Sequence, residues 1–149
     1  MKRIERYFAE AERHIEAIDE ALDELGCVEL KEPDTLSKLQ RFALEIVIFR
    51  FSKLQDLLGT KLFRAYLDAM GFVSEGKSFY EILRELEKEG VVDTDTWSYL
   101  RHLRNEIAHE YPEDEKVRMQ KAALILNGTK ELMEIYRRLR EKYDAAYLR

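Results

Sequence analysis

The segment FALEIVIFRF, residues 42–51, decides the fold, because it is apolar on nearly every side when it forms a helix. A helix at the surface of a globular protein has one apolar stripe, so this segment is expected to be covered on two sides. In a monomeric bundle it would be the central helix, whereas in a dimer one of its sides would meet a second subunit. Glu45 and Arg50 interrupt the segment and Asp56 follows it. Each is expected to form a salt bridge, because an unpaired charge in so apolar a helix is costly.

The flanking sequence limits this helix and predicts a long helix before it. Pro33 and Asp34 form a turn signal, with Asp34 as the expected N-cap, and Gly59 is expected to end the helix. Upstream, apolar residues alternate at helical spacing, which predicts a helix with one apolar seam that ends at Gly26. His14 lies beside this seam and is expected to be a rim residue. The seam consists of Ile4, Phe8, Ala11, Ile15, Ile18, Leu22 and Leu25.

Two shorter helices are expected next. TKLFRAYLDAM, residues 60–70, predicts a helix that ends at Gly71. Ser78 and Glu81 form the S-x-x-E pattern of a capping box, which predicts the start of a short helix. Gly90 is expected to end it.

Two long helices complete the chain. DTD, residues 93–95, can cap the first of them, and Pro112 fits the first position of the second, which runs to near the C-terminus. Asn127 and Gly128 mark a candidate bend in this last helix. The sequence has no strand pattern, internal repeat or linker. We therefore predict an all-α fold: a single domain, residues 1–149, built as a four-helix up-and-down bundle with one or two additional short helices.

Composition and charge narrow the classes of function. The single cysteine, Cys27, excludes an internal disulfide framework and a cysteine-based zinc site. The net charge of −5 gives no broad attraction to nucleic acid or anionic lipid, so a nucleic-acid role must rest on a local basic site. The chain has no signal-peptide pattern and no apolar window that approaches the length of a membrane span, so we expect a cytoplasmic protein.

Polar and titratable side chains crowd into RNEIAHEYP, residues 104–112, ahead of a helix-breaking proline. Asn105 and His109 are four residues apart, so Asn105 could hold the histidine tautomer or orient a ligand. Histidine moves protons near neutral pH, and the guanidinium of Arg104 suits phosphate oxygens. This is the minimal set for cutting RNA without a metal, in which a 2′-hydroxyl attacks the adjacent phosphate. The reaction needs a base and an acid, and a two-fold dimer would supply the second histidine.

Two other interpretations stay open on the residues alone. R-x4-H arises often by chance in helices rich in Arg and Glu, and His109 would then be a surface histidine. Glu106 and His109 also form E-x-x-H, with His102 on the same face, as in di-metal helical bundles. Such a site needs a second E-x-x-H and the chain has no other, so no metal is expected unless a dimer completes the site.

Arg104, His109 and Tyr111 form R-x4-H-x-Y, with Asn105 after the arginine. This pattern closely resembles the signature of HEPN-domain ribonucleases, specifically the toxin of HEPN–MNT toxin–antitoxin modules. The likeness covers nearly the whole chain. A long first helix, a second helix containing LQRFALEIVIFRF and a long helix after the motif occur in the order of that family.

The resemblance implies a homodimer in which the two motifs line one cleft and cut RNA without a metal or other cofactor. Arg104, Asn105 and His109 would form the catalytic site. The resemblance also implies a partner protein, a minimal nucleotidyltransferase that acts as antitoxin and transfers AMP to the motif tyrosine, here Tyr111.

The resemblance leaves two points open. In that family an acidic residue of the second helix often lies near the site, and Glu45 and Asp56 are both candidates. A related branch with this fold lacks nuclease activity and is described as a non-catalytic binding subunit of a nucleotidyltransferase. The intact R-x4-H-x-Y motif favours the active branch.

Overall fold

The computed structural model describes residues 2–27, 36–108 and 115–148, and this part of the chain is helical, with no strand. The predicted all-α class is therefore confirmed. The elements are α1 (Arg3–Leu25), α2 (Lys38–Leu57), η2 (Leu58–Leu62), α3 (Phe63–Ala69), α4 (Phe79–Lys88), α5 (Thr94–Ala108) and α6 (Glu115–Tyr147).

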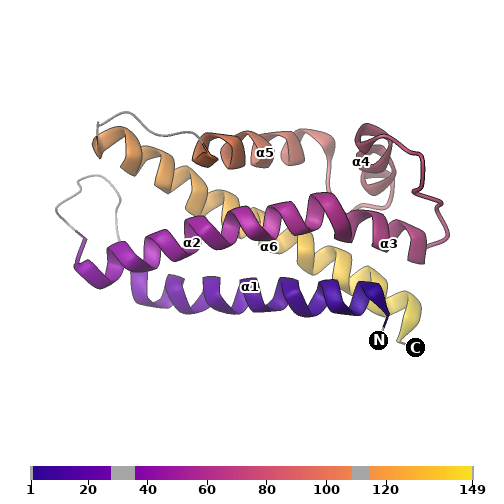
Figure 1. Ribbon diagram of the computed structural model, residues 1–149, viewed down its shortest axis with the longest axis horizontal. Helices are drawn as coiled ribbons and strands as arrows, with labels where there is room; N and C mark the ends of the chain where they lie inside the picture. The colour runs from indigo at the N-terminus through magenta and orange to yellow at the C-terminus, as the bar shows by residue number, and fades with distance from the viewer. Residues whose placement is uncertain (1, 28–35, 109–114, 149) are drawn as a thin grey trace.

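Four long helical runs alternate in direction along the molecule (Figure 1). α1 leads away from the end at which both termini lie, and α2 with η2 and α3 returns to that end. α5 leads away again and α6 crosses back. The short α4 stands between α3 and α5. This arrangement is the predicted up-and-down bundle with added short helices.

α2, η2 and α3 form one uninterrupted helical run, so the prediction that Gly59 ends the second helix is wrong. The run passes through a single π-turn, η2, which takes up an extra residue without a break. Glycine inside a helix costs about 1 kcal/mol relative to alanine, and here it makes room for a neighbour. A Cβ at position 59 would lie 3.0 Å from Cζ2 of Trp97. The run ends before Gly71, whose φ of +94° suits glycine, as predicted.

The cap of α2 differs from the predicted one. Oγ of Ser37 accepts a hydrogen bond from the backbone N of Gln40 at 3.1 Å, and Oε1 of Gln40 accepts one from the backbone N of Ser37 at 2.9 Å. This pair is a full capping box. Asp34, the predicted cap, lies outside the described residues, and α2 begins later than a helix capped there would begin.

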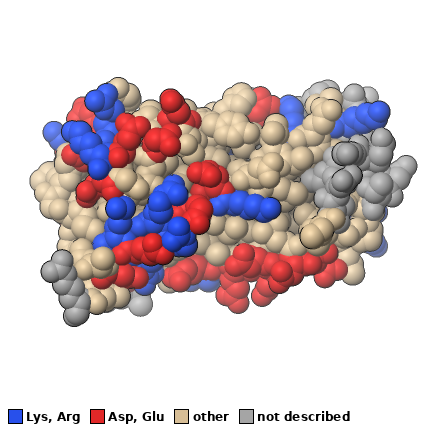
Figure 2. Space-filling model, turned by 180° about the vertical axis from the view of Figure 1, so that it is seen from behind, with Lys and Arg blue, Asp and Glu red and all other residues tan. Residues whose placement is uncertain are grey.

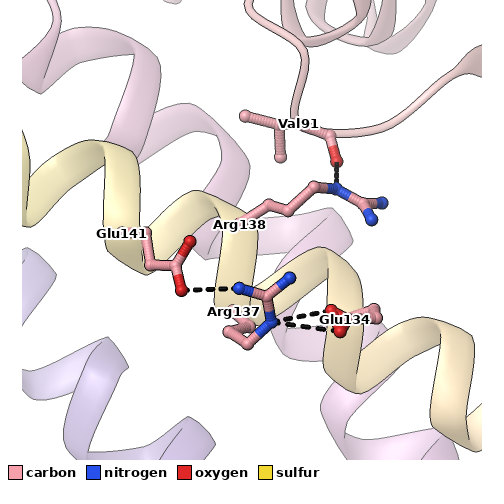
Figure 3. Close-up of polar contacts among 5 residues, drawn as sticks. All are labelled: Val91, Glu134, Arg137, Arg138 and Glu141. Atoms are coloured by element: carbon pink, nitrogen blue, oxygen red, sulfur yellow. Dashed lines mark hydrogen bonds and ion pairs between the residues drawn. The ribbon is translucent and has the colours of Figure 1, made fainter.

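α4 and α5 begin at caps that the sequence predicts. Oγ of Ser78 accepts from a backbone N–H in the first turn of α4 at 3.2 Å. Asp93 caps α5, because its Oδ1 accepts from the backbone N of Thr96 at 2.7 Å. Figure 3 shows how α6 holds the loop between the two helices: Nε of Arg138 donates to the carbonyl O of Val91 at 3.0 Å.

α6 is a single helix that runs through Asn127 and Gly128 without a break. Gly128 serves close packing, because a Cβ there would lie 2.8 Å from Cδ1 of Leu103 and 3.3 Å from Cδ2 of Leu100. The ring of Phe51 would be 3.6 Å away. α2, α5 and α6 therefore meet at this glycine. Pro112, the expected first residue of the helix, lies outside the described residues.

The apolar seam of α1 is confirmed; it packs mainly on α2 and meets α6 through large side chains. Phe8 meets two tyrosine rings of α6 edge-on, Tyr136 at a centroid distance of 6.2 Å and Tyr143 at 5.0 Å. Arg140 of α6 lies over the Phe8 ring at 4.2 Å and donates to Glu12 of α1 at 3.1 Å. The fully buried or nearly buried seam residues are Ile4, Phe8, Ala11, Ile18 and Leu25, and Ile15 and Leu22 pack at the edge of the core.

The second half of α1 has an acidic edge. Figure 2 shows a row of acidic side chains along the lower edge of the molecule, where α1 runs. Residues 14–25 contain no Lys or Arg, and their acidic members are Glu16, Asp19, Glu20, Asp23 and Glu24.

Among the described helices, none combines the length and the apolar character that crossing a membrane requires.

Candidate functional site

A pocket of about 320 Å³ opens between the end of α2 and the face of α5. Its volume is at the low end of ligand pockets, which span roughly 300–1,000 Å³. Two of the three predicted catalytic residues, Arg104 and Asn105, border it. The wall combines charged, amide and aromatic side chains: Gln55, Asp56, Thr60, Phe79, Trp97, Arg101, Arg104 and Asn105, with Gly59 between them.

Arg104 and Asp56 form a two-point ion pair between α5 and α2 at this pocket. Nε of Arg104 donates to Oδ1 of Asp56 at 3.2 Å, and Nη2 donates to Oδ2 at 3.1 Å. Two parallel hydrogen bonds fix the plane of a guanidinium as well as its position. The side chain of Asp56 is 46% exposed and that of Arg104 is 28% exposed, so the pair is open to a ligand.

The ion pair leaves most of the guanidinium available. A guanidinium has five N–H groups, and two of them are used on Asp56. Among the described residues Arg104 has no other hydrogen-bond partner, so three N–H groups remain. An arginine held in this way is oriented by the protein and can still bind a phosphate oxygen.

Asp56 is the acidic residue that the structure brings to Arg104; Glu45 is elsewhere. The two positions are separated by about 16 Å along the helix axis. Glu45 is exposed near the middle of α2, on the rims of two grooves that contain neither Arg104 nor Asn105. Of the two candidate supporting acids, Asp56 is therefore the one that contacts the motif arginine.

The motif is described only through its first two residues. Asn105 is exposed in the last turn of α5, and the helix ends at Ala108. His109 and Tyr111 lie outside the described residues. In the sequence, position 109 directly follows the last residue of α5 and is four residues after Asn105.

Glu106, the acid of the alternative E-x-x-H motif, ties α5 to α6. It accepts from Nζ of Lys121 at 2.6 Å, and another of its oxygens lies 3.6 Å from Nε2 of His102. Its partner in the motif, His109, is not described. Within residues 2–27, 36–108 and 115–148, no group of three or more His, Cys, Asp or Glu side chains is placed to hold a metal ion.

Five side chains of the pocket are absent from the predicted site: Gln55, Thr60, Phe79, Trp97 and Arg101. Arg101 could have been found, because it precedes Arg104 by three residues and so shares its helix face. Gln55 is adjacent to Asp56, but nothing in the sequence marks it as facing a cavity. Phe79 reaches the pocket from α4, a contact that only the tertiary fold creates.

One face of α2 is uncovered within the described chain. Its four large apolar residues follow helical spacing and are between 44% and 60% exposed. They border a groove of about 790 Å³ between α1 and α2. α2 packs against α1, α5 and α6, and the face that bears these four residues stays uncovered, which leaves the second-subunit alternative for this face. We call this face the α2 stripe: Leu39, Phe42, Ile46 and Phe49.

Arg50, beside the α2 stripe, has a neutral partner and not the expected carboxylate. Its Nη1 lies 3.0 Å from Nδ1 of His14. A guanidinium only donates, so Nδ1 accepts and the imidazole proton is assigned to Nε2, which lies 4.0 Å from an oxygen of Glu10. Burial, and then the charge of Arg50, lower the pKa of His14 from its ordinary value of 6.5. The half-buried His14 occupies the rim position that the sequence predicts.

No protein-family model matches the chain, and neither curated proteins nor solved structures include a significant match to it.

Proposed function

We propose that the protein is a metal-independent endoribonuclease that acts as the toxin of a HEPN–MNT-type toxin–antitoxin pair. One observation carries the proposal: the arginine of the R-x4-H-x-Y motif lies at a pocket, oriented by an acid of the second helix. The two hydrogen bonds to Asp56 fix the plane of the guanidinium at the edge of the pocket, where its other N–H groups can meet a phosphate. The motif likeness supplies the reaction class, and the geometry of Arg104 and Asp56 is compatible with it.

In the proposed reaction Arg104 acts on the phosphate. The 2′-oxygen of RNA forms a bond to the neighbouring phosphorus, and the bond from phosphorus to the 5′-oxygen breaks. The products are a 2′,3′-cyclic phosphate and a 5′-hydroxyl. Negative charge grows on the non-bridging phosphoryl oxygens, and the remaining N–H groups of Arg104 stabilise it. Asp56 is a positioning residue, because it holds the guanidinium plane and does not touch the substrate.

His109 supplies the proton transfer. A base removes the proton of the 2′-hydroxyl, and an acid protonates the leaving 5′-oxygen. A single imidazole is in only one of these states at a time. Two copies of the chain, each with its own His109, provide one base and one acid. Asn105 would orient the imidazole or the ligand from the preceding turn.

The α2 stripe supports the homodimer that this mechanism needs. A two-fold axis brings the same surface of both copies together. The groove beside the stripe has acidic residues on the α1 side, whereas α2 carries four basic residues and two acidic ones. The acidic edge of one copy can therefore face the basic residues of the other, around an apolar centre. Charge complementarity of this kind selects a partner and its orientation.

The antitoxin in this proposal is a minimal nucleotidyltransferase that transfers AMP from ATP to Tyr111. The phenol oxygen forms a bond to the α-phosphorus and pyrophosphate leaves. The product carries a phosphodiester close in sequence to Arg104, where it competes with substrate phosphate for the free N–H groups. An added anion also repels RNA.

The direct test is cleavage of labelled RNA in EDTA, with analysis of the ends. We expect 2′,3′-cyclic phosphate and 5′-hydroxyl ends. His109→Ala and Arg104→Ala should each reduce the rate by about 10²-fold or more. Arg84→Ala is the matched control, because Arg84 is an exposed arginine on α4 away from the pocket. Cleavage that EDTA abolishes and added metal restores would overturn the metal-independent assignment in favour of the E-x-x-H site.

Two observations favour a second function. Asp56 partly neutralises Arg104, and the α2 stripe exposes four large apolar side chains. Both features suit a non-catalytic helical subunit that binds a nucleotidyltransferase. If no RNA is cut and His109→Ala weakens only the binding of that partner, this second function is the correct one.

A further inference from the structure

Gln55 is the buried polar side chain of the pocket beside Arg104. It is 5% exposed and lines the cavity. Within the described part of the chain its amide has no hydrogen-bond partner. The amide atoms are not among the enclosed, unpaired polar atoms of the described chain, so they are reached from the cavity, where water or a ligand can pair with them. The amide offers donors and an acceptor side by side, which is the pattern that the edge of a nucleobase also offers.

Flat side chains line the cavity near Gln55. The guanidinium of Arg101 lies over the ring of Phe79, 5.8 Å from its centroid. The Phe79 ring in turn lies 6.4 Å from the ring of Trp97, at a tilt of 50°. Phe79 is half-buried and Arg101 is exposed, so the planar guanidinium faces solvent at the mouth. Unpaired RNA bases commonly stack on the planes of arginine guanidinium groups and aromatic rings.

We propose that this pocket binds one nucleobase of a single RNA strand, next to the phosphate held by Arg104. The inference rests on the proposed ribonuclease function and adds a subsite to it. Gln55 pairs with the edge of the base, and the Arg101 plane covers its face. The carboxylate of Asp56 lines the same cavity, which favours a neutral base inside and keeps the phosphate at the Arg104 rim. A duplex hides its base faces, so the strand must be unpaired here.

The experiment measures binding without cleavage. Fluorescent hexamers of 2′-deoxyadenosine, deoxycytidine, deoxyguanosine and deoxyuridine lack the 2′-hydroxyl nucleophile, so they report affinity even if the chain cuts nothing. We expect the full-length protein to prefer one of the four bases. Gln55→Met keeps the side-chain volume and removes the amide, and should abolish the preference. Arg101→Gln should weaken all four complexes by about fivefold to tenfold, the scale of losing one stacking partner.

Matched controls exist on the same molecule. Gln120→Met removes an exposed amide on α6. Arg84→Gln removes a guanidinium that lies over the Tyr80 ring at 5.6 Å, a centroid distance close to that of Arg101 over Phe79, but outside the pocket. Neither control should change affinity or preference. Free AMP, CMP, GMP and UMP serve as competitors, to distinguish a site for an RNA strand from a site for a mononucleotide. If a mononucleotide binds as tightly as the hexamers and displaces them, the RNA assignment is overturned.

The outcomes separate this inference from the nuclease assignment. Equal affinity for all four hexamers, no binding, or an unchanged preference in Gln55→Met would overturn the base pocket, whether or not natural RNA is cut. A preference that depends on Gln55, together with no cleavage of RNA, would support the base pocket and overturn the nuclease. If Gln55→Met does not fold, Gln55→Glu serves instead: it offers only acceptors, so it should shift the preference toward guanine, whose edge has two adjacent donors.

Discussion

Arg104 on α5 and Asp56 on α2 are joined by two parallel hydrogen bonds of 3.2 and 3.1 Å. The residues are 48 positions apart in the sequence, so the contact exists only because α2 and α5 pack side by side. The pair connects the arginine of the R-x4-H-x-Y motif to an acidic residue that follows FALEIVIFRF on α2. The pair also borders the pocket that contains Gln55 and Arg101.

Asp56→Asn should lower RNA cleavage by about tenfold to a hundredfold, because the guanidinium of Arg104 loses its fixed plane. The loss should appear in kcat more than in KM, since Arg104 keeps its charge. Asp56→Glu should restore part of the rate. Glu45→Gln is measured in parallel and should have the smaller effect. A larger loss in Glu45→Gln than in Asp56→Asn would contradict the assignment of Asp56.

The elements that the sequence predicted well are those with a local cause. The seam of α1 follows from spacing alone, and the starts of α4 and α5 follow from Ser78 and Asp93. The cap at Ser37 also has a local signal, S-x-x-Q in SKLQ, but the stronger-looking turn residues Pro33 and Asp34 drew the prediction away from it.

The elements that escaped prediction depend on contacts between distant segments. Gly59 looks like a helix end, yet its place against Trp97 turns it into a packing residue inside a continuous run. Gly128, which looks like a bend in the sequence, is likewise a packing residue, because it lies close against Leu103 inside a continuous helix. The choice between Glu45 and Asp56 depends on the register of α2 against α5, which no local pattern encodes.

Gly128→Val should destabilise the protein by about 1–3 kcal/mol, the usual cost of overpacking a core. A branched side chain there would meet Leu103, Leu100 and Phe51, and only part of this cost is offset by the better helix propensity of valine. Urea unfolding at fixed protein concentration measures the change. Asn127→Val, the exposed neighbour on the same helix, should stay within about 0.5 kcal/mol.

His14 should make the stability of the fold depend on pH. Burial and Arg50 lower its pKa in the folded state, while Glu10 raises it and Arg13 and Lys53 lower it further. A lowered pKa means that the folded protein binds fewer protons than the unfolded chain. The contribution of His14 is therefore complete above pH 6.5 and is lost progressively as the pH falls below 6.5.

His14→Asn tests this dependence, because its Oδ1 can accept from Arg50 and does not titrate. The loss in free energy of unfolding between pH 7.5 and pH 5.5 should be smaller in the variant than in the wild type. Equal slopes in His14→Asn and the wild type would show that this histidine is not coupled to folding.

Tyr111→Phe should escape the AMP-dependent block by the nucleotidyltransferase while it still cuts RNA. The variant lacks the phenol oxygen that accepts AMP in the proposed reaction, whereas Arg104, Asp56 and His109 are intact. Incubation with ATP, magnesium and the partner, followed by peptide mass spectrometry, should place the added mass on Tyr111 in the wild type. Modification at another residue, with activity still lost and Tyr111 unmodified, would contradict this prediction and leave the nuclease assignment standing.

The α2 stripe should hold two copies of the chain together. Ile46, at the centre of the stripe, is 44% exposed, and burying an isoleucine side chain contributes about 1.5 kcal/mol or more. The contribution counts once in each copy, so Ile46→Glu should weaken the dimer by about 3 kcal/mol, or more than a hundredfold in Kd. Light scattering at micromolar concentration should show a dimer for the wild type and a monomer for this variant.

The same variant tests whether the active site is shared between subunits. The Ile46→Glu monomer should keep its helical content, because Ile46 is not part of the buried core, and it should lose cleavage because each site lacks the second histidine. Val73→Glu is the control: Val73 is 69% exposed in the loop between α3 and α4, so the change adds the same charge without touching the stripe. It should remain dimeric and active. A folded Ile46→Glu monomer that cuts RNA at the wild-type rate would mean that one chain holds both the base and the acid, and the second proton carrier would then have to be sought within a single subunit.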